Sequence, residues 1–244
     1  MDEALSRFAS LIGEESIETL ARSRVMVFGL GGVGGSAVEA LARAGIGEFD
    51  LIDGDVFEAS NLNRQALSSI VTLGKNKAEV GKERILSINP KAVVHTYPYF
   101  YLPEDKKDID ILKADFVIDA IDMVKAKLDV IEQCYLYSVP LVSALGCGNR
   151  MDPSKFRLDD IHKTELDPLA KIVRKACREK GIKSLRVVYS TEAPIKPDAS
   201  LMGGNSPFKR GSIPGSSPFV PPAAGLLLAY EAVRVLLEKG AKPK

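Results

Sequence analysis

A glycine-rich loop followed by an isolated acidic residue is the first stretch of the chain whose spacing suggests chemistry. The motif GLGGVGG places Gly29, Gly31, Gly32 and Gly34 directly after an apolar run. Glycines let a backbone approach phosphate closely, and the helix expected to begin near Gly34 presents unpaired N–H groups at its N-terminus. The loop therefore predicts a phosphate-containing ligand. Asp53, about 20 residues later, suits a ribose hydroxyl, so these two features alone would favour NAD.

Polar and charged side chains around this loop favour a nucleoside triphosphate over NAD. Asn61 and Arg64, in the segment DVFEASNLNRQ, follow the acidic residue at the place where a second phosphate would lie. A hydride-transfer enzyme has no need of an arginine there. Lys77 opens the next predicted helix, and Asp122 ends the apolar run FVIDAID at the carboxyl edge of the sheet, where open α/β sheets bind ligands. Two cations and a carboxylate around one nucleotide are typical of ATP and its Mg²⁺.

The elements that must position these residues alternate between strand and helix. Apolar runs predict strands at 25–30, 49–53, 92–100, 114–122, 140–146 and 185–191. Helical spacing predicts helices at 36–45, 75–89, 125–138 and 167–181. This alternation is typical of a Rossmann-like α/β fold, a doubly wound and mostly parallel sheet with helices on both faces. The chain has 244 residues, enough for one substantial core, so we expect a single domain over 1–244.

Cysteine usage and the chain ends bear on the class and location of the protein. Cys134, Cys147 and Cys177 form no CxxC pair, which argues against a disulfide framework and a zinc knuckle. The N-terminus lacks the basic start and apolar core of a secretory signal. The stretch AAGLLLAYEAVRVLL contains Glu231 and Arg234 and falls short of the roughly 20 apolar residues that a membrane span needs. We expect a cytoplasmic protein with this stretch as a core helix, and peripheral membrane association stays open.

Five segments together resemble the E1-like adenylating family, which includes ubiquitin-activating enzymes and enzymes of the molybdopterin and thiamine pathways. They are GLGGVGG, LIDGD, SNLNRQ, GKNKAEV and DAID, within residues 1–150. The resemblance implies an ATP site made by Gly31, Gly32, Asp53, Asn61, Arg64, Lys77 and Asp122. It places Asp122 beside Mg²⁺ and gives catalytic roles to Arg64, Lys77 and Asp122. Arg7 resembles the family's N-terminal arginine that reaches the ATP of the other subunit, which implies a homodimer and a catalytic role for Arg7.

The remainder of the chain is similar to the bacterial tRNA threonylcarbamoyladenosine dehydratase subfamily. The likeness lies in CGNRMDPSKFRLDDIHKTELDPLAKIVRKACREKGI and in VVYSTEAP. It implies an enzyme that adenylates a carboxylate on a modified tRNA adenosine and cyclises it, releasing AMP and pyrophosphate, with the nucleophile already in the substrate. It also implies a nucleotide-binding core at 1–150. The part at 151–244 would face the substrate with a helix, a strand and a C-terminal helix, and its content of Gly, Ser and Pro predicts a mobile loop at 202–222.

Two other functions stay open on the residues. The first is adenylation of the C-terminus of a ubiquitin-like sulfur carrier, which the missing CxxC pairs make less favoured and which would add a sulfur-relay protein as partner. The second is a dehydrogenase or an NAD-binding regulator built on the same glycine loop. Arg64, Lys77 and Asp122 weigh against this second alternative, because a redox cofactor does not require them.

The predicted helix at 167–181 tests the tRNA expectation independently of the resemblance. Its apolar face is predicted at Leu169, Ile172, Val173 and Ala176. Its basic face is predicted at Lys171, Arg174, Lys175 and Arg178, shifted by two residues or roughly 200° around a helix. A concentrated basic face is the electrostatic footprint expected for an RNA backbone. An ordinary solvated helix face is the alternative interpretation.

The remaining candidate residues have simpler interpretations. Cys147 is either a thioester-forming nucleophile or a buried structural cysteine, and the sequence favours the structural interpretation. Neither His95 nor His162 has a partner at metal-ligand spacing, so both are assigned to structure or surface. Lys209 and Arg210, in the predicted loop, are weaker candidates for closing over RNA.

Overall fold

The computed structural model describes residues 3–106, 108–198 and 214–240. Within these residues seven strands form one sheet in the order β3-β2-β1-β4-β5-β7-β6. The strands are β1 Arg24–Phe28, β2 Glu48–Ile52, β3 Val93–Tyr97, β4 Phe116–Asp119, β5 Leu141–Ala144, β6 Phe156–Asp160 and β7 Arg186–Ser190. Every neighbouring pair is parallel except β6 and β7. The predicted doubly wound, mostly parallel sheet is confirmed.

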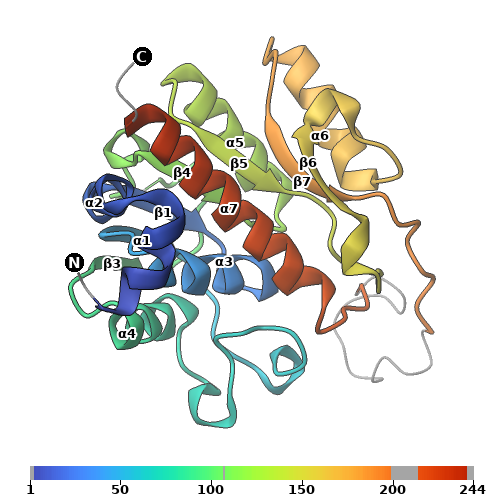
Figure 1. Cartoon of the computed structure of the whole chain (residues 1–244). Coiled ribbons are helices and arrows are strands. Elements are labelled where there is room, and N and C mark those ends of the chain that lie inside the picture. The colour runs from blue at the N-terminus through green and yellow to red at the C-terminus, as the bar shows by residue number, and fades with distance from the viewer. Residues whose placement is uncertain (1–2, 107, 199–213, 241–244) are drawn as a thin grey trace.

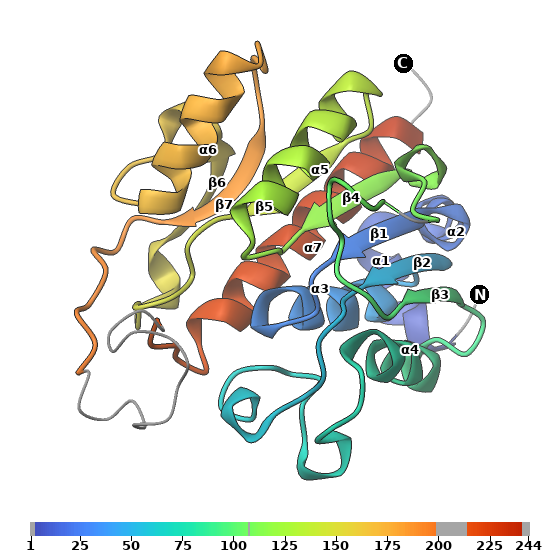
Figure 2. The ribbon, with the colours of Figure 1, turned by 180° about the vertical axis from the view of Figure 1, so that it is seen from behind.

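Helices cover both faces of this sheet (Figures 1 and 2). Helices α5 Val124–Leu136 and α6 Pro168–Glu179 lie on one face. The other face carries α2 Glu14–Arg22, α3 Gly32–Arg43, α4 Lys77–Ile88 and the long α7 Val220–Gly240, and α1 Ser6–Ile12 packs on α2. Because β1 is followed by α3 and β4 by α5, the loops at the carboxyl ends of these strands meet at one edge of the sheet.

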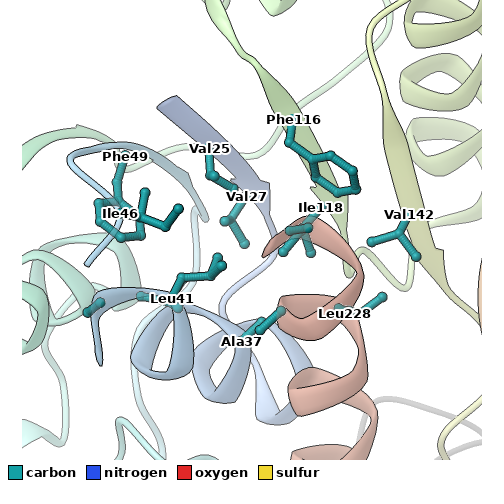
Figure 3. Close-up of a cluster of buried hydrophobic side chains, with 14 of the residues drawn as sticks. Val25, Val27, Ala37, Leu41, Ile46, Phe49, Phe116, Ile118, Val142 and Leu228 are labelled. Atoms are coloured by element: carbon teal, nitrogen blue, oxygen red, sulfur yellow. The ribbon is translucent and has the colours of Figure 1, made fainter. Parts of the chain in front are cut away.

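The largest core cluster lies between the sheet and the pair α3 and α7 (Figure 3). Val25 and Val27 of β1 are fully buried against it, together with Leu41 of α3 and Leu228 of α7. The two helices approach closely at Gly225, where a side chain would place its Cβ 2.2 Å from the carbonyl oxygen of Val33. The C-terminal helix therefore completes the core beneath the glycine loop.

Helix α7 is long and apolar enough by composition to cross a membrane, but half of its most apolar stretch is buried inside the fold. A core helix passes the same test of length and composition, and the packing of α7 on α3 matches the predicted core helix. Residues 220–222 belong to this helix although the sequence predicted a loop there, since prolines are accepted in the first turn of a helix. The rest of the predicted loop, including Lys209 and Arg210, lies largely outside the described residues.

Some elements differ from the sequence-based prediction. Strand β6 was not predicted, because FRLDD is an edge strand with charged side chains and no apolar run. Helices α1 and α2 were not predicted either. Helix α3 begins at Gly32 rather than near Gly34 or at residue 36, so the glycine motif itself forms its first turn.

Candidate functional site

A cavity of about 770 Å³ opens at the carboxyl edge of the sheet. It is bordered by the loops that follow β1, β2, β4 and β5 and by the first turns of α4 and α6. Eight of the predicted nucleotide-site residues line it, namely Gly29, Gly31, Gly32, Asp53, Asn61, Arg64, Lys77 and Asp122. Its volume lies in the range of about 300–1,000 Å³ typical of small-molecule sites.

The glycines of the loop have different structural roles. Gly29 has a φ of +86°, and a Cβ on it would lie 2.6 Å from the carbonyl oxygen of Ala120. Gly31 is the N-cap of α3, and a Cβ there would meet nothing closer than 3.9 Å, so its backbone faces open space in the cavity. Gly34 does not line the cavity, since its Cα packs against Gly29, where an added Cβ would lie 1.8 Å from the carbonyl oxygen.

Asp53 ties the glycine loop to the end of β2. One carboxylate oxygen, Oδ2, accepts the backbone N–H of Leu30 at 2.6 Å, and Oδ1 accepts the N–H of Asp55 at 2.8 Å. Burial raises the pKa of Asp53, although these backbone hydrogen bonds act in the opposite direction. The carboxylate thus holds the backbone of the loop in place before any ligand binds.

Lys77 is the first residue of α4, and its ammonium lies at the cavity. The side chain is 7% exposed, and Nζ donates to Asp55 Oδ2 at 3.0 Å. Asn76 caps the helix by accepting the N–H groups of Ala78 and Glu79, and its Nδ2 donates to the backbone of Asp53 and Asp55. The cap therefore fixes the place where Lys77 enters the site.

Arg64 and Asn61 share one turn that lines the cavity. The backbone carbonyl of Asn61 accepts the N–H groups of Arg64 and Gln65, and its side-chain Oδ1 accepts the N–H of Glu58. The guanidinium of Arg64 donates through Nη1 to the carbonyl oxygen of Ser60 at 2.7 Å. Gln65, which the sequence reasoning missed, is 6% exposed and lines the cavity next to Gly31.

The segment DAID contains two aspartates in different environments. Strand β4 ends at Asp119 rather than at Asp122, and Asp119 is fully buried. Its Oδ2 accepts from Lys127 Nζ at 2.6 Å and from Ser143 Oγ at 2.5 Å, which joins β4, β5 and α5. Asp122 lies three residues beyond, exposed in the loop, and lines the cavity. No cluster of three or more metal-ligating side chains occurs in the described residues, so Asp122 is a single carboxylate.

Segments distant in sequence close the other half of the cavity. Residues 146–150, which follow β5, and residues 167–169, which begin α6, line it. Asn149 exchanges two hydrogen bonds with Gly215, at 2.6 and 2.7 Å. Asn63 donates to the carbonyl oxygen of Ser216 at 2.9 Å. The short segment before α7 thus joins the loop that carries Arg64 to the loop that follows β5.

Cys147 lines the cavity as a neutral thiol. Burial, together with the nearby carboxylates of Asp122 and Asp167, raises its pKa to about 12. Its Sγ lies 3.3 Å from the carbonyl oxygen of Leu145 as a hydrogen-bond donor. A nucleophilic cysteine needs a lowered pKa, so this environment favours the structural interpretation.

Arg7 lies away from the cavity of its own chain. It is exposed on α1 and does not line the cavity. Leu5, just before α1, packs beside Gly45, which follows the far end of α3. Because α3 begins at the cavity and its 12 residues span about 18 Å, Arg7 lies at the opposite end of this layer. Contact between Arg7 and a nucleotide would therefore require a second copy of the chain.

The predicted basic face lies on α6, but part of it makes contacts within the chain. Arg174 donates through Nη1 to the backbone and hydroxyl oxygens of Thr164. The Nζ atom of Lys175 lies 3.7 Å from Oε1 of Glu179. Lys171 and Arg178 are exposed and form no ion pair within the part of the chain that the structure describes. The buried face consists of Ala170, Val173, Ala176 and Cys177. The predicted apolar face is therefore buried only in part, since Ile172 is 48% exposed.

Comparisons with known proteins agree with this geometry. A model of the ThiF family matches residues 5–244. The tRNA threonylcarbamoyladenosine dehydratase of Bacillus subtilis is 39% identical over 239 residues, which cover 96% of this chain and 94% of that protein. The crystal structure of Escherichia coli tRNA N6-threonylcarbamoyladenosine dehydratase, TcdA, in complex with ATP has a TM-score of 0.86 and 31% identity, and covers 99% of this chain and 97% of that chain. The molybdopterin-synthase adenylyltransferase of Salmonella typhimurium is 37% identical over 138 residues, 57% of this chain and 54% of that protein.

Proposed function

The chain belongs to the ThiF family, and from that premise we propose that it is an ATP-dependent tRNA threonylcarbamoyladenosine dehydratase. The observation that carries this proposal is the extent of the likeness. The Bacillus subtilis dehydratase matches 96% of the chain and therefore includes both halves of the cavity, whereas the Salmonella typhimurium adenylyltransferase matches 57%. The sulfur-carrier alternative is consequently the more distant one.

ATP binds in the half of the cavity that contains the glycine loop. The backbone N–H groups at Gly31 and in the first turn of α3 donate hydrogen bonds to phosphate oxygens, because N–H groups at a helix N-terminus attract anions. Arg64 and Lys77 neutralise the charge of the triphosphate and of the departing pyrophosphate. What supports these roles is that both cations line the same cavity as the loop.

Mg²⁺ fits the donor set at Asp122. Mg²⁺ is commonly bound by one or two carboxylates together with phosphate oxygens and water, so the single exposed carboxylate at the cavity is sufficient. When bound, the ion would neutralise charge on the phosphates. Asp122 would hold it on the side of the cavity that faces the loop after β4.

The reaction activates a carboxylate and then displaces AMP. The substrate carboxylate attacks the α-phosphorus of ATP, the bond between the α-phosphorus and the bridging oxygen breaks, and pyrophosphate leaves. The neighbouring carbamoyl group then attacks the activated carbonyl, loses a proton, and displaces AMP. One carboxylate oxygen leaves with AMP, so the nucleoside loses the elements of water. No protein nucleophile is required, which agrees with the neutral thiol of Cys147.

Assembly and location are further parts of the proposal. The enzyme is a homodimer in which Arg7 of one subunit reaches the ATP of the other, since Arg7 lies away from the cavity of its own chain. Lys171 and Arg178 on α6 contact the tRNA backbone. The enzyme works in the cytoplasm, with 1–150 as nucleotide-binding core and 151–244 facing the substrate. A sulfur-relay protein is a further proposed partner.

The test follows the oxygen atom. The threonylcarbamoyl carboxylate of the tRNA is labelled with ¹⁸O, ATP is added, and AMP and the nucleoside are analysed by mass spectrometry, with unmodified tRNA as control. We expect AMP and pyrophosphate with the modified tRNA only, one ¹⁸O in AMP, and loss of water from the nucleoside. Absence of AMP with modified tRNA, together with ATP–pyrophosphate exchange that depends on a ubiquitin-like carrier, would establish the alternative.

A further inference from the structure

Arg150 and Asp167 form a buried pair in the half of the cavity remote from the glycine loop. Both residues line the cavity, and their side chains are 1% and 0% exposed. Arg150 follows β5, which is two strands from β1 in the sheet, and Asp167 is the N-cap of α6. The proposed function gives neither residue a role.

The hydrogen bonds of this pair are unevenly distributed. Asp167 is well satisfied, since Oδ1 accepts the N–H groups of Leu169 and Ala170 at 2.8 and 3.0 Å and Oδ2 accepts the N–H of Gly146 at 2.9 Å. Arg150 donates through Nε to the carbonyl oxygen of Gly146 at 3.0 Å, and its closest approach to Asp167 is 3.5 Å. Its Nη1 has no hydrogen-bond partner in the described part of the chain.

A buried guanidinium without an acceptor for one nitrogen is costly. Buried charges are normally paired and hydrogen-bonded, and a buried donor without a partner destabilises the fold, more so when it is charged. Asp167 already shares its charge among three backbone donors. Cys147, the neighbouring side chain at this end, is a neutral thiol and supplies no negative charge.

We propose that Arg150 binds the carboxylate of the threonylcarbamoyl group of the tRNA substrate. This inference rests on the proposed function and adds the place where the reacting group is held. A guanidinium matches the planar geometry of a carboxylate, and its fixed charge offsets the repulsion that a carboxylate meets when it approaches a triphosphate. Asp167 acts as a positioning residue, because it fixes the loop at Gly146 to which Arg150 is bonded.

A purely structural role for Arg150 would make a different use of its contacts. The bonds to Gly146 and Asp167 are enough to hold the loop after β5 against α6, and such a clasp would not depend on the chemistry of the substrate. Carboxylate binding requires in addition that the protein distinguish an acid from a neutral analogue of the same shape. The two roles are therefore separated by varying the ligand as well as the protein.

The experiment measures binding of two stem-loop RNAs in the presence of a non-hydrolysable ATP analogue. One RNA carries the threonylcarbamoyl adenosine, and the other carries the same group with its carboxylate replaced by a carboxamide. We expect the native chain to bind the acid roughly 10- to 100-fold more tightly than the amide. In Arg150→Met the preference is lost through weaker binding of the acid, while the Kd of the ATP analogue is unchanged.

Arg157→Met is the matched control. Arg157 is exposed on β6, lies outside the cavity lining and, within the described residues, donates to the nearby backbone carbonyls of Ser154 and Phe156. This variant keeps the preference for the acid. If Arg150→Met does not fold, Arg150→Lys replaces it, with a preference reduced but not lost because the charge stays and the planar geometry does not.

Two outcomes overturn the inference. One is an Arg150 variant that folds and keeps the full preference for the acid, and the other is a native chain that binds acid and amide equally. In either case AMP release with modified tRNA still decides the proposed function separately. A native chain that releases no AMP with modified tRNA overturns the proposed function, whatever the binding preference.

Discussion

At the scale of single residues, the site consists of charges that are held before a ligand arrives. The side chain of Lys77 is buried, and its ammonium forms an ion pair with the exposed carboxylate of Asp55. Both carboxylate oxygens of Asp53 accept hydrogen bonds from backbone N–H groups. Preorganised charges of this kind stabilise a developing negative charge without reorganising during the reaction. The chemistry proposed for Lys77 therefore depends on its position as much as on its charge.

Lys77→Ala tests this position. We expect the rate of AMP formation to fall roughly 100- to 1,000-fold, the usual effect of removing one donor that faces developing charge. Lys75→Ala is the control, because Lys75 is exposed in the loop just before α4 and does not line the cavity. The measurement is AMP release with modified tRNA, and a Lys77→Ala protein with native activity would contradict the assigned role.

At the scale of elements, α3 and β1 are held together by a contact that only glycine permits. Gly34 in α3 lies against Gly29, and the geometry leaves no room for a Cβ. This close approach brings the first turn of α3 beneath the cavity. The same helix is covered on its other side by α7, which is why the C-terminal helix matters for the nucleotide half of the site.

Gly34→Ala and Gly31→Ala separate packing from binding. A Cβ at Gly34 would lie 1.8 Å from a carbonyl oxygen, so we expect this variant to lose at least about 3 kcal/mol of stability. Gly31→Ala has space for its methyl group, so we expect a Tm close to that of the native chain. Its methyl group would occupy the cavity, so we expect the affinity for ATP to fall by roughly tenfold or more. Calorimetry for Tm and a titration with ATP check both, and the reverse pattern would refute the assignment.

A buried carboxylate joins α7 to β7. Glu231 accepts hydrogen bonds from Arg186 and Arg234 at 2.8 Å each. Burial alone would raise the pKa of Glu231, but the hydrogen bonds from Arg234 and Arg186 outweigh it and lower the pKa below the ordinary 4.5. A lowered folded-state pKa stabilises the fold above the unfolded pKa, and this stabilisation is lost as the pH falls through the folded pKa.

Glu231→Gln tests that linkage. At pH 7 we expect a loss of about 2 kcal/mol, or a Tm lower by roughly 4–8 °C. The difference from the native protein should narrow as the pH falls below 4.5, where the unfolded chain binds the proton first, and should narrow further as the pH passes the lower pKa of the folded carboxylate. Glu238→Gln is the control, because Glu238 is an exposed partner of Arg234 and should change stability little. A pH-independent difference would show that Glu231 acts through packing alone.

At the scale of the whole molecule, the segments after residue 150 belong to the same body as the nucleotide half. Strand β7 pairs with β5 within the sheet, and α7 returns to pack beside α3 against the same face of the sheet. The cavity is consequently shared between both parts of the chain. Arg7 is the exception, because its own chain keeps it at the far end of α3.

Complementation between two defective variants tests whether Arg7 acts across a dimer. Arg7→Ala and Lys77→Ala are mixed under conditions that allow subunits to exchange. A mixed dimer has one complete site, since the Arg7→Ala subunit keeps Lys77 and receives Arg7 from its partner. At equal amounts half of the dimers are mixed, so we expect about one quarter of the native AMP-forming activity. No recovery in a mixture shown to exchange would refute the arrangement.

The sequence by itself determined the alternating strands and helices and the residue types of the site, which are those expected around ATP. These features are readable because strand and helix periods, and the glycines required by a close backbone approach, are recorded in residues near one another along the chain. The strand ends that carry Asp53 and the DAID segment were located to within a few residues.

Only the tertiary structure decided which side chains meet. It showed that Asp122 lines the cavity, whereas Asp119 is buried and pairs with Lys127 of α5. It also brought Arg150 and Asp167 together at the cavity and paired the edge strand β6 with β7. The physical reason is that these partners come from segments far apart in sequence, and their contacts depend on the order and packing of the strands, which no local pattern of residues records.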